Sequence, residues 1–238
     1  MKKATITENY RNEWKYLCSA PDWGAIEDKL KHLLLLDRNS SESGDYQVHS
    51  LYFDDIEDSC MADNGAGNSF RLKFRIRYYG NAPETLHLEC KKKRNGRCIK
   101  LVTNLTKEQY DMLTSGYADE LLLQTDDALL KRFCLYFSQK LLTPKIIIDY
   151  DRTAYIEDIS NIRITYDQNI SASIETDRFL TGGYLGCPVS SCDAVLEVKF
   201  DNILPGYLAR LINEKHLEVS SYSKYYLGRL KCSEYYRS

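Results

Sequence analysis

The chain has 238 residues, of which 43% are hydrophobic and 28% charged, and its formal net charge at pH 7 is −2. This length and composition are ordinary for a globular protein that buries a sizeable core. The near-neutral charge balance speaks against a general nucleic-acid-binding surface, for which a basic chain is expected. No apolar run approaches the roughly 18 residues needed to cross a membrane.

In chain order, the sequence predicts strands and helices as follows. They are a strand over 13–19, a helix over 21–36, strands over 48–55, 69–79, 85–93 and 98–105, helices over 106–113 and 126–141, strands over 144–155, 161–167 and 194–200, and a helix over 204–216. The strand segments are rich in β-branched and aromatic residues and mostly alternate in polarity.

Local signals mark the ends of several of these elements. Asp22 is a candidate N-cap for the first helix, and Thr106 with Gln109 has the spacing of a capping box. The segment 62–69 is rich in Gly, Asn and Asp and is predicted to be a loop. Because the helices do not follow each strand, we expect an α+β fold in which an antiparallel β-barrel or wrapped sheet is decorated with helices. One domain is expected over 1–238.

The cysteines do not suggest a disulfide framework or a zinc site. They are Cys18, Cys60, Cys90, Cys98, Cys134, Cys187, Cys192 and Cys232. Their spacing is irregular, no C-x-x-C pair occurs, and the first residues lack the apolar core of a secretory signal. We therefore expect reduced thiols and a cytoplasmic location.

The segment RLKFRIRYYG, residues 71–80, is the most informative stretch of the chain. Its alternate residues are Arg71, Lys73, Arg75 and Arg77 on one face, and apolar or aromatic on the other. Successive cations on such a face are about 6–7 Å apart. Like charges this close repel each other, so an anion bound over them would be stabilising.

Charged faces recur on the other predicted strands. They carry Glu13 with Lys15, Glu89 with Lys91, Lys100, Tyr150 with Arg152, and Glu197 with Lys199. For any single strand, a solvated sheet face explains these charges. Taken together, they fit a barrel whose interior binds a polyanion, because Arg and Lys suit phosphate oxygens. The interspersed carboxylates could hold Mg²⁺ or Mn²⁺ against a phosphate chain.

The order of motifs resembles a known family almost from end to end. The matching segments are RNEWKY, SLYFDD, RIRYYG, LECKKK, IKL, DYDRTAY, IRITYD, LEVKFDNILP and SKYYLG. In this order they resemble the polyphosphate polymerase domain of the vacuolar transporter chaperone family. That family lies within the triphosphate tunnel metalloenzyme (CYTH-like) superfamily.

The resemblance implies an antiparallel tunnel in which the terminal phosphate of ATP is transferred to a growing polyphosphate, with Mn²⁺ or Mg²⁺ as cofactor. It assigns Glu197 to the metal, with Glu13 and Glu89 as further candidates. It assigns the transferred phosphate to Arg75, Arg77, Lys91 and Arg152. The phosphate-binding and ATP-binding residues would be Lys15, Arg75, Arg77, Lys91, Lys100, Tyr150, Arg152, Lys199, Ser223 and Lys224. Arg71 and Lys73 would lie at the tunnel mouth or just outside it.

The sequence departs from the hydrolytic members of that superfamily in one motif. Those members open with E-x-E-x-K, whereas Arg11 replaces the first Glu here. Three alternatives stay open beside the polymerase: a metal-dependent triphosphatase, a non-enzymatic polyphosphate-binding module, and a nucleic-acid-binding barrel, against which the near-neutral charge speaks. The membrane spans of the eukaryotic polymerase are not found in this chain, so any coupling to a membrane would come from a membrane protein partner.

Overall fold

The computed structural model describes residues 10–37, 40, 44–190 and 194–235. The strands are β1 (Asn12–Cys18), β2 (Leu35–Leu36), β3 (Asp45–Asp54), β4 (Phe70–Tyr79), β5 (Leu86–Arg94), β6 (Arg97–Leu105), β7 (Thr143–Glu157), β8 (Ile162–Ser173), β9 (Cys187–Pro188) and β10 (Ala194–Phe200). The helices are α1 (Ala20–Leu30), α2 (Ser59–Gly65), α3 (Lys107–Thr114), α4 (Ala118–Gln124), α5 (Ala128–Lys140), α6 (Gly206–Asn213) and α7 (Lys224–Tyr235), with a 3-10 helix η1 (Thr176–Arg178). All eight predicted strands are confirmed.

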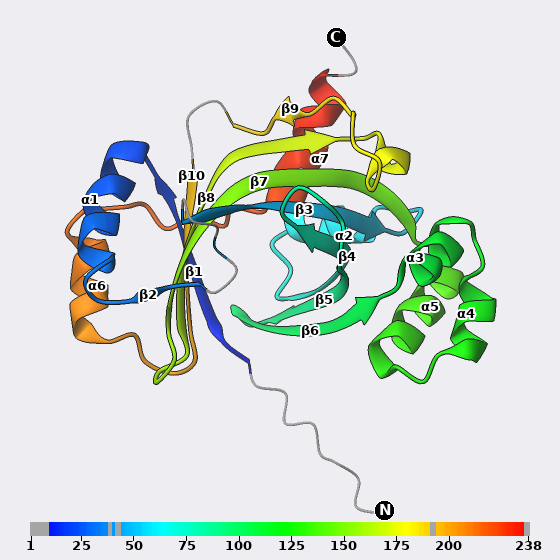
Figure 1. Ribbon diagram of the computed structural model, residues 1–238, viewed down its shortest axis with the longest axis horizontal. Coiled ribbons are helices and arrows are strands. Elements are labelled where there is room, and N and C mark those ends of the chain that lie inside the picture. Colours follow the sequence, from blue (N-terminus) through cyan, green and yellow to red (C-terminus); the bar gives the residue numbers. More distant parts are fainter. Residues whose placement is uncertain (1–9, 38–39, 41–43, 191–193, 236–238) are drawn as a thin grey trace, which may run out of the picture.

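The strands form one antiparallel sheet that curls back toward its own start (Figure 1). The path runs β1-β10-β8-β7-β3-β4-β5-β6, with β2 paired to β7 and β9 to β8. Among the described residues, its two ends meet at one bridge, in which the Arg11 and Cys98 amides donate to each other's carbonyls at 2.9 and 3.0 Å. The predicted α+β antiparallel fold is confirmed, but within the described ranges no continuous ladder closes the sheet.

Two groups of helices cover the outer face of the curled sheet, each over its own apolar cluster (Figure 1). Helices α3, α4 and α5 pack over β3–β6, and their cluster is centred on Phe133 and Phe74. Helices α1 and α6 cover β1, β8 and β10. Helix α7 packs on β7 and β8 from the inner face, because Gly228 contacts Ile148, and Ile148 shares its face with Arg77 through the paired residue Ser50. The outer face thus carries two of the three apolar clusters, and the part of the inner face that α7 does not cover is free to carry polar residues.

Helix ends and some helices differ from the sequence predictions. The N-cap of α1 is Ser19, whose hydroxyl accepts from the Asp22 amide at 3.2 Å, so Asp22 lies in the first turn. The capping box of Thr106 and Gln109 is confirmed at α3. The segment 62–69 is not all loop, because α2 extends to Gly65. Helices α2, α4 and α7 were not predicted.

Helix α7 approaches the sheet very closely at Gly228. A Cβ at this position would lie 2.5 Å from Cδ1 of Ile148 and 3.2 Å from Cβ of Ala172. Atoms do not approach that closely, so only glycine lets the helix sit at this depth. The close packing fixes the first turn of α7, which supplies residues to the inner face.

Two further features concern the cysteines and the membrane. The seven cysteines that the structure describes are free thiols, and Sγ of Cys187 and Sγ of Cys232 lie within hydrogen-bond distance at 3.1 Å. Cys192 lies outside the described residues. Within the described ranges, no helix has both the length and the apolar character required to cross a membrane.

Candidate functional site

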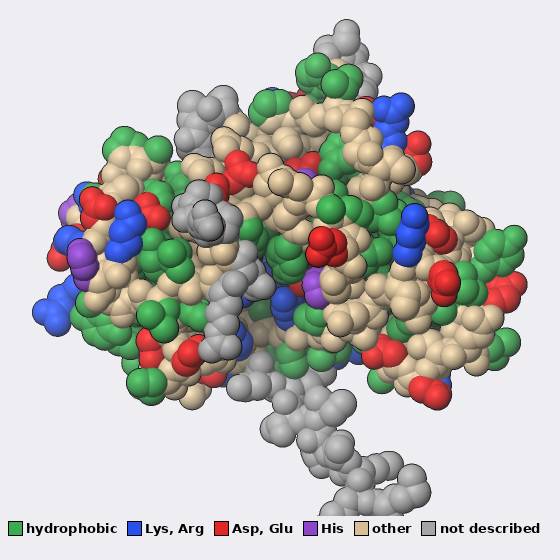
Figure 2. Space-filling view, in the orientation of Figure 1, with side chains coloured by type: hydrophobic (Ala, Val, Ile, Leu, Met, Phe, Trp, Pro, Cys, Tyr) green, Lys and Arg blue, Asp and Glu red, His purple; other side chains and the backbone are tan. Residues whose placement is uncertain are grey.

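The cationic strand faces converge on one cavity of about 270 Å³ inside the curled sheet. Its lining includes thirteen lysines and arginines and two glutamates. Lysine and arginine side chains are visible in the hollow at the centre of the face shown in Figure 2. In a chain with a net charge of −2, such a concentration creates a strongly positive site that suits a polyanion.

The structure brings together the site residues that the sequence suggested. Those lining the cavity are Glu13, Lys15, Arg75, Arg77, Lys91, Lys100, Tyr150, Arg152, Glu197, Lys199, Ser223 and Lys224. Glu89 lies behind this lining, in contact with three of its cations. Arg71 and Lys73 also line the cavity rather than lying outside it. Three buried carboxylate groups organise these cations.

The first group is centred on Glu89 in β5, which is only 2% exposed. Its carboxylate accepts from Nε of Arg75 at 2.6 Å and from Nζ of Lys100 at 3.0 Å, and Nη1 of Arg77 lies 3.9 Å away. Burial opposes ionisation, but these cations outweigh it and hold the pKa of Glu89 well below its ordinary value. Glu89 is therefore ionised and serves as the counter-ion of these three cations.

Two tyrosines extend this group across the inner face. Arg77 donates to the hydroxyls of Ser50 at 2.9 Å and Tyr150 at 2.8 Å, and Arg75 donates to that of Tyr52 at 2.7 Å. Burial raises the pKa of the Tyr52 phenol, but the two guanidinium groups outweigh burial and lower this pKa to about 8. Tyr150 accepts from Arg77, so its own proton can point at a ligand.

The second group joins Glu13 of β1 to Glu197 of β10. Lys15 lies between them, 3.5 Å from Glu13 and 3.7 Å from Glu197. Lys91 donates to both oxygens of Glu13 at 2.6 and 2.7 Å, and Lys199 pairs with Glu197. Burial and Glu197 raise the pKa of Glu13, yet the lysines outweigh both and lower it to about 2. Both carboxylates are therefore ionised near neutral pH.

The pair of Glu13 and Glu197 is the best candidate for holding a divalent metal. In the β1–β10 register Glu13 pairs with Lys199 and Lys15 with Glu197, so the two carboxylates are diagonal neighbours on one face. Neither oxygen of Glu197 is without a cation, because Oε1 pairs with Nζ of Lys199 and Oε2 lies 3.7 Å from Nζ of Lys15. Nor do the described residues contain a cluster of three or more His, Cys, Asp or Glu that could ligate a metal. Phosphate oxygens would have to complete the coordination shell.

The third group is centred on Asp167 of β8, which the sequence analysis missed. It is fully buried and accepts from Nε of Arg152 at 2.6 Å and from Nζ of Lys224 at 2.7 Å. Burial opposes its ionisation, but both cations outweigh burial and lower the pKa of Asp167. In the strand predicted over 161–167, Arg163, Thr165 and Asp167 alternate with Ile162, Ile164 and Tyr166, so the two-residue alternation puts Asp167 on the inner face.

A fourth group carries cations without a carboxylate partner among the described residues. Nη1 of Arg71 donates to Oδ1 of Asn64 at 2.7 Å. Nζ of Lys73 donates to the same oxygen and to Oγ of Ser223, both at 3.0 Å. Lys93 lies beside Arg71, its partner across the β4–β5 ladder. We call Arg71, Lys73 and Lys93 the carboxylate-free cluster.

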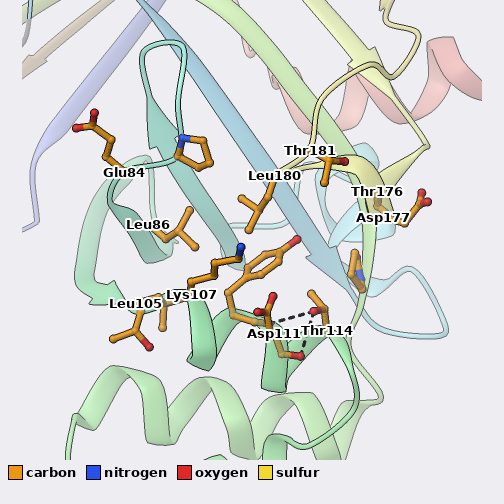
Figure 3. Close-up of a pocket in the computed structure, with 14 residues that line it drawn as sticks. Glu84, Leu86, Leu105, Lys107, Asp111, Thr114, Thr176, Asp177, Leu180 and Thr181 are labelled. Carbon is orange, nitrogen blue, oxygen red and sulfur yellow. Dashed lines mark hydrogen bonds between the residues drawn. The ribbon is translucent and has the colours of Figure 1, made fainter.

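A second, larger cavity of about 750 Å³ lies outside the curled sheet, between α3, η1 and the start of β7 (Figure 3). Its charged lining residues are Glu84, Asp111 and Asp177 against Lys107 alone. Leu86, Leu105 and Leu180 contribute apolar surface (Figure 3). This net negative lining does not suit a polyanion, so the smaller cationic cavity is the candidate site.

The curled antiparallel sheet with a cationic interior places the protein in the class of triphosphate tunnel (CYTH-like) folds. A candidate adenylyl cyclase from Hippeastrum, whose structure is reported to reveal a dominant triphosphatase activity, is 15% identical, with a TM-score of 0.57 over 93% of this chain and 96% of its own. A candidate adenylate cyclase from Bacillus halodurans is 11% identical, with a TM-score of 0.52 over 90% of this chain and 93% of its own. At these identities the likeness concerns the fold alone.

Within that class, the chain belongs to the VTC domain family, whose profile matches residues 10–232. No curated protein matches the chain in sequence. The family match covers all strands of the sheet and the first turns of α7, and therefore the whole candidate site.

Proposed function

We propose that this protein is a polyphosphate polymerase that transfers the terminal phosphate of ATP to a growing polyphosphate chain in the cationic cavity. The observation that carries the proposal is the cavity lining of thirteen cations and two glutamates, in a chain of the VTC domain family. A linear polyanion can meet cations along the whole inner face. Use of ATP as donor fits the cytoplasmic location expected from the sequence.

In the proposed reaction, a terminal phosphate oxygen of the chain attacks the γ-phosphorus of ATP. A P–O bond forms there, the bond from this phosphorus to the β–γ bridging oxygen breaks, and ADP leaves with that electron pair. The attacking oxygen is already anionic, so no general base and no covalent enzyme intermediate is needed. Positioning and charge neutralisation are then the main contributions of the protein.

The inner-face residues divide into two roles in this reaction. Arg75, Arg77, Lys91 and Arg152 would neutralise the charge on the transferred phosphoryl group. The other phosphates would be held by Lys15, Lys100, Tyr150, Lys199, Ser223 and Lys224. Glu197, with Glu13, would hold Mn²⁺ or Mg²⁺, and Glu89 would serve as counter-ion instead. When bound, the metal would supply additional positive charge on the phosphate oxygens.

A metal-dependent triphosphatase is the second candidate, favoured by the activity reported for the Hippeastrum protein of the same fold. Hydrolysis needs an activated water, and a carboxylate usually orients or deprotonates it. Here Glu13, Glu89, Asp167 and Glu197 are all in ion pairs with lysine or arginine. This engagement of the carboxylates favours transfer to an anionic acceptor over transfer to water.

Incubation of the purified protein with ATP and Mn²⁺ separates these functions. The products are run on a gel stained for polyphosphate, and free phosphate and ADP are measured in parallel. A ladder of chains with ADP, absent with Glu197→Gln, is expected of the polymerase. Free phosphate without chains would establish the triphosphatase instead. Tight polyphosphate binding without any product would leave a binding module.

A further inference from the structure

Charge neutralisation is unequal along the row of cations on β4. Arg75 and Arg77, at one end of the row, share the carboxylate of Glu89. Arg71 and Lys73, at the other end, donate only to neutral oxygens of Asn64 and Ser223 in the hydrogen bonds described above. The row covers six residue steps, or about 20 Å along an extended strand, which is much longer than a triphosphate.

The register of the sheet increases the positive charge at the Arg71 end. Arg71 lies directly opposite Lys93, and Lys73 opposite Lys91. Like charges in directly opposed positions destabilise a sheet. Lys91 is neutralised by Glu13, but no carboxylate among the described residues pairs with Arg71, Lys73 or Lys93. The described residues thus contain three clustered cations that none of their carboxylates balances by an ion pair.

The neutral partners of these cations are suited to exchange for a ligand. Asn64 lies near the end of α2, and Ser223 lies just before α7, so the partners come from two elements outside β4. An amide or hydroxyl oxygen satisfies a cation's hydrogen bond but leaves its charge. A phosphate oxygen would supply the same hydrogen bond and also neutralise the charge.

We propose that the carboxylate-free cluster of Arg71, Lys73 and Lys93 binds the phosphates of a long chain beyond those held near Glu13 and Glu197, and so makes the protein prefer polyphosphate to a triphosphate. The cluster acts as a specificity-determining extension of the cavity. This inference rests on the proposed function only in that the cavity binds phosphate chains, and it does not depend on catalysis.

Calorimetric titration of the metal-free protein with tripolyphosphate and with size-fractionated polyphosphate tests the proposal. The variant Arg71→Gln/Lys73→Met should lose tenfold or more in polyphosphate affinity, and its tripolyphosphate affinity should stay within twofold of wild type. Lys93→Gln, on a different strand, should show the same selective loss and serves as a second test if the double variant does not fold. Lys131→Gln is the control, because Lys131 is partly exposed on α5 and pairs with Asp126.

An equal loss for both ligands would overturn the proposal, because the cluster would then belong to the triphosphate site itself. Unchanged affinity for both would overturn it too. If the wild-type protein makes no chains from ATP but the variants lose affinity for polyphosphate alone, the polymerase proposal is refuted and this inference stands. If the wild-type protein makes chains from ATP but the variants show no selective loss of polyphosphate affinity, this inference is refuted and the polymerase proposal stands.

Discussion

Replacing Glu89 by glutamine tests whether this carboxylate is a counter-ion or a metal ligand. The substitution keeps the shape of the side chain but removes the charge that Arg75 and Arg77 share. The Arg77 side chain is only 3% exposed, whereas that of Lys100 is 47% exposed and can be solvated. Breaking a buried ion pair from one side costs about 3–5 kcal/mol.

The lower end of that range applies here, because the glutamine oxygen still accepts one hydrogen bond. A loss of about 3 kcal/mol lowers the melting temperature of a chain of this size by about 6–12 °C. A phosphate ligand should restore most of this loss, since a ligand at a hundred times its Kd stabilises the folded state by about 2.7 kcal/mol. Urea denaturation with and without tripolyphosphate measures both effects.

The control for this experiment is Glu84→Gln, an exposed glutamate on the β4–β5 connection. It should leave the free energy of unfolding unchanged. A loss below about 1 kcal/mol for Glu89→Gln would refute the counter-ion role, since that is the range of an exposed ion pair. Unchanged stability together with a raised Mn²⁺ requirement would identify Glu89 as a metal ligand instead.

Three further predictions follow from individual residues. Burial lowers the pKa of Lys73 to about 8, so the protonated form is disfavoured in the folded protein. The wild-type protein should therefore gain stability relative to Lys73→Met as pH rises from about 8 toward the ordinary lysine pKa of about 10.4. Parallel thermal melts across this pH range that show no such gain would contradict the lowered pKa of Lys73. Glu197→Gln should abolish Mn²⁺-dependent turnover of ATP while polyphosphate binding, measured by calorimetry, persists; turnover within tenfold of wild type would exclude it as the metal carboxylate. Gly228→Ala should lower the free energy of unfolding by about 1–3 kcal/mol because its Cβ would overlap Ile148, and Ile148→Val should recover part of this loss in denaturation experiments.

The strands were predictable because two-residue alternation is a local property. Each strand carries its own apolar face, so β4 could be read from residues 69–79 without knowing its neighbours. The same reasoning correctly placed cations on inner faces, and it would have included Asp167 had the alternation been followed to the end of 161–167. Helix α7 has no comparable signal, since its turns mix lysine, tyrosine and glycine.

The ion-pair partners could not be predicted, because they depend on how the sheet curls. Lys91 and Glu13 are 78 positions apart in sequence and meet only because β1 and the β5–β6 hairpin come together. Arg152 and Lys224 share Asp167 because α7 packs over β7 and β8. No local pattern distinguishes a cation that is neutralised in this way from Arg71 and Lys73, which have no carboxylate partner among the residues described.

In the part of the chain that the structure describes, the single bridge between Arg11 and Cys98 leaves a slit along one side of the sheet rather than a closed tube. A long polymer can enter a sealed tube only by one of its ends, whereas a slit allows a middle segment to be inserted sideways. The backbone part of the slit consists of two hydrogen bonds, worth together about 1–3 kcal/mol. The ion pair of Lys91 with Glu13 joins the same two ends of the sheet. A phosphate chain that competed for Lys91 would break this ion pair and so weaken the junction through which the chain enters.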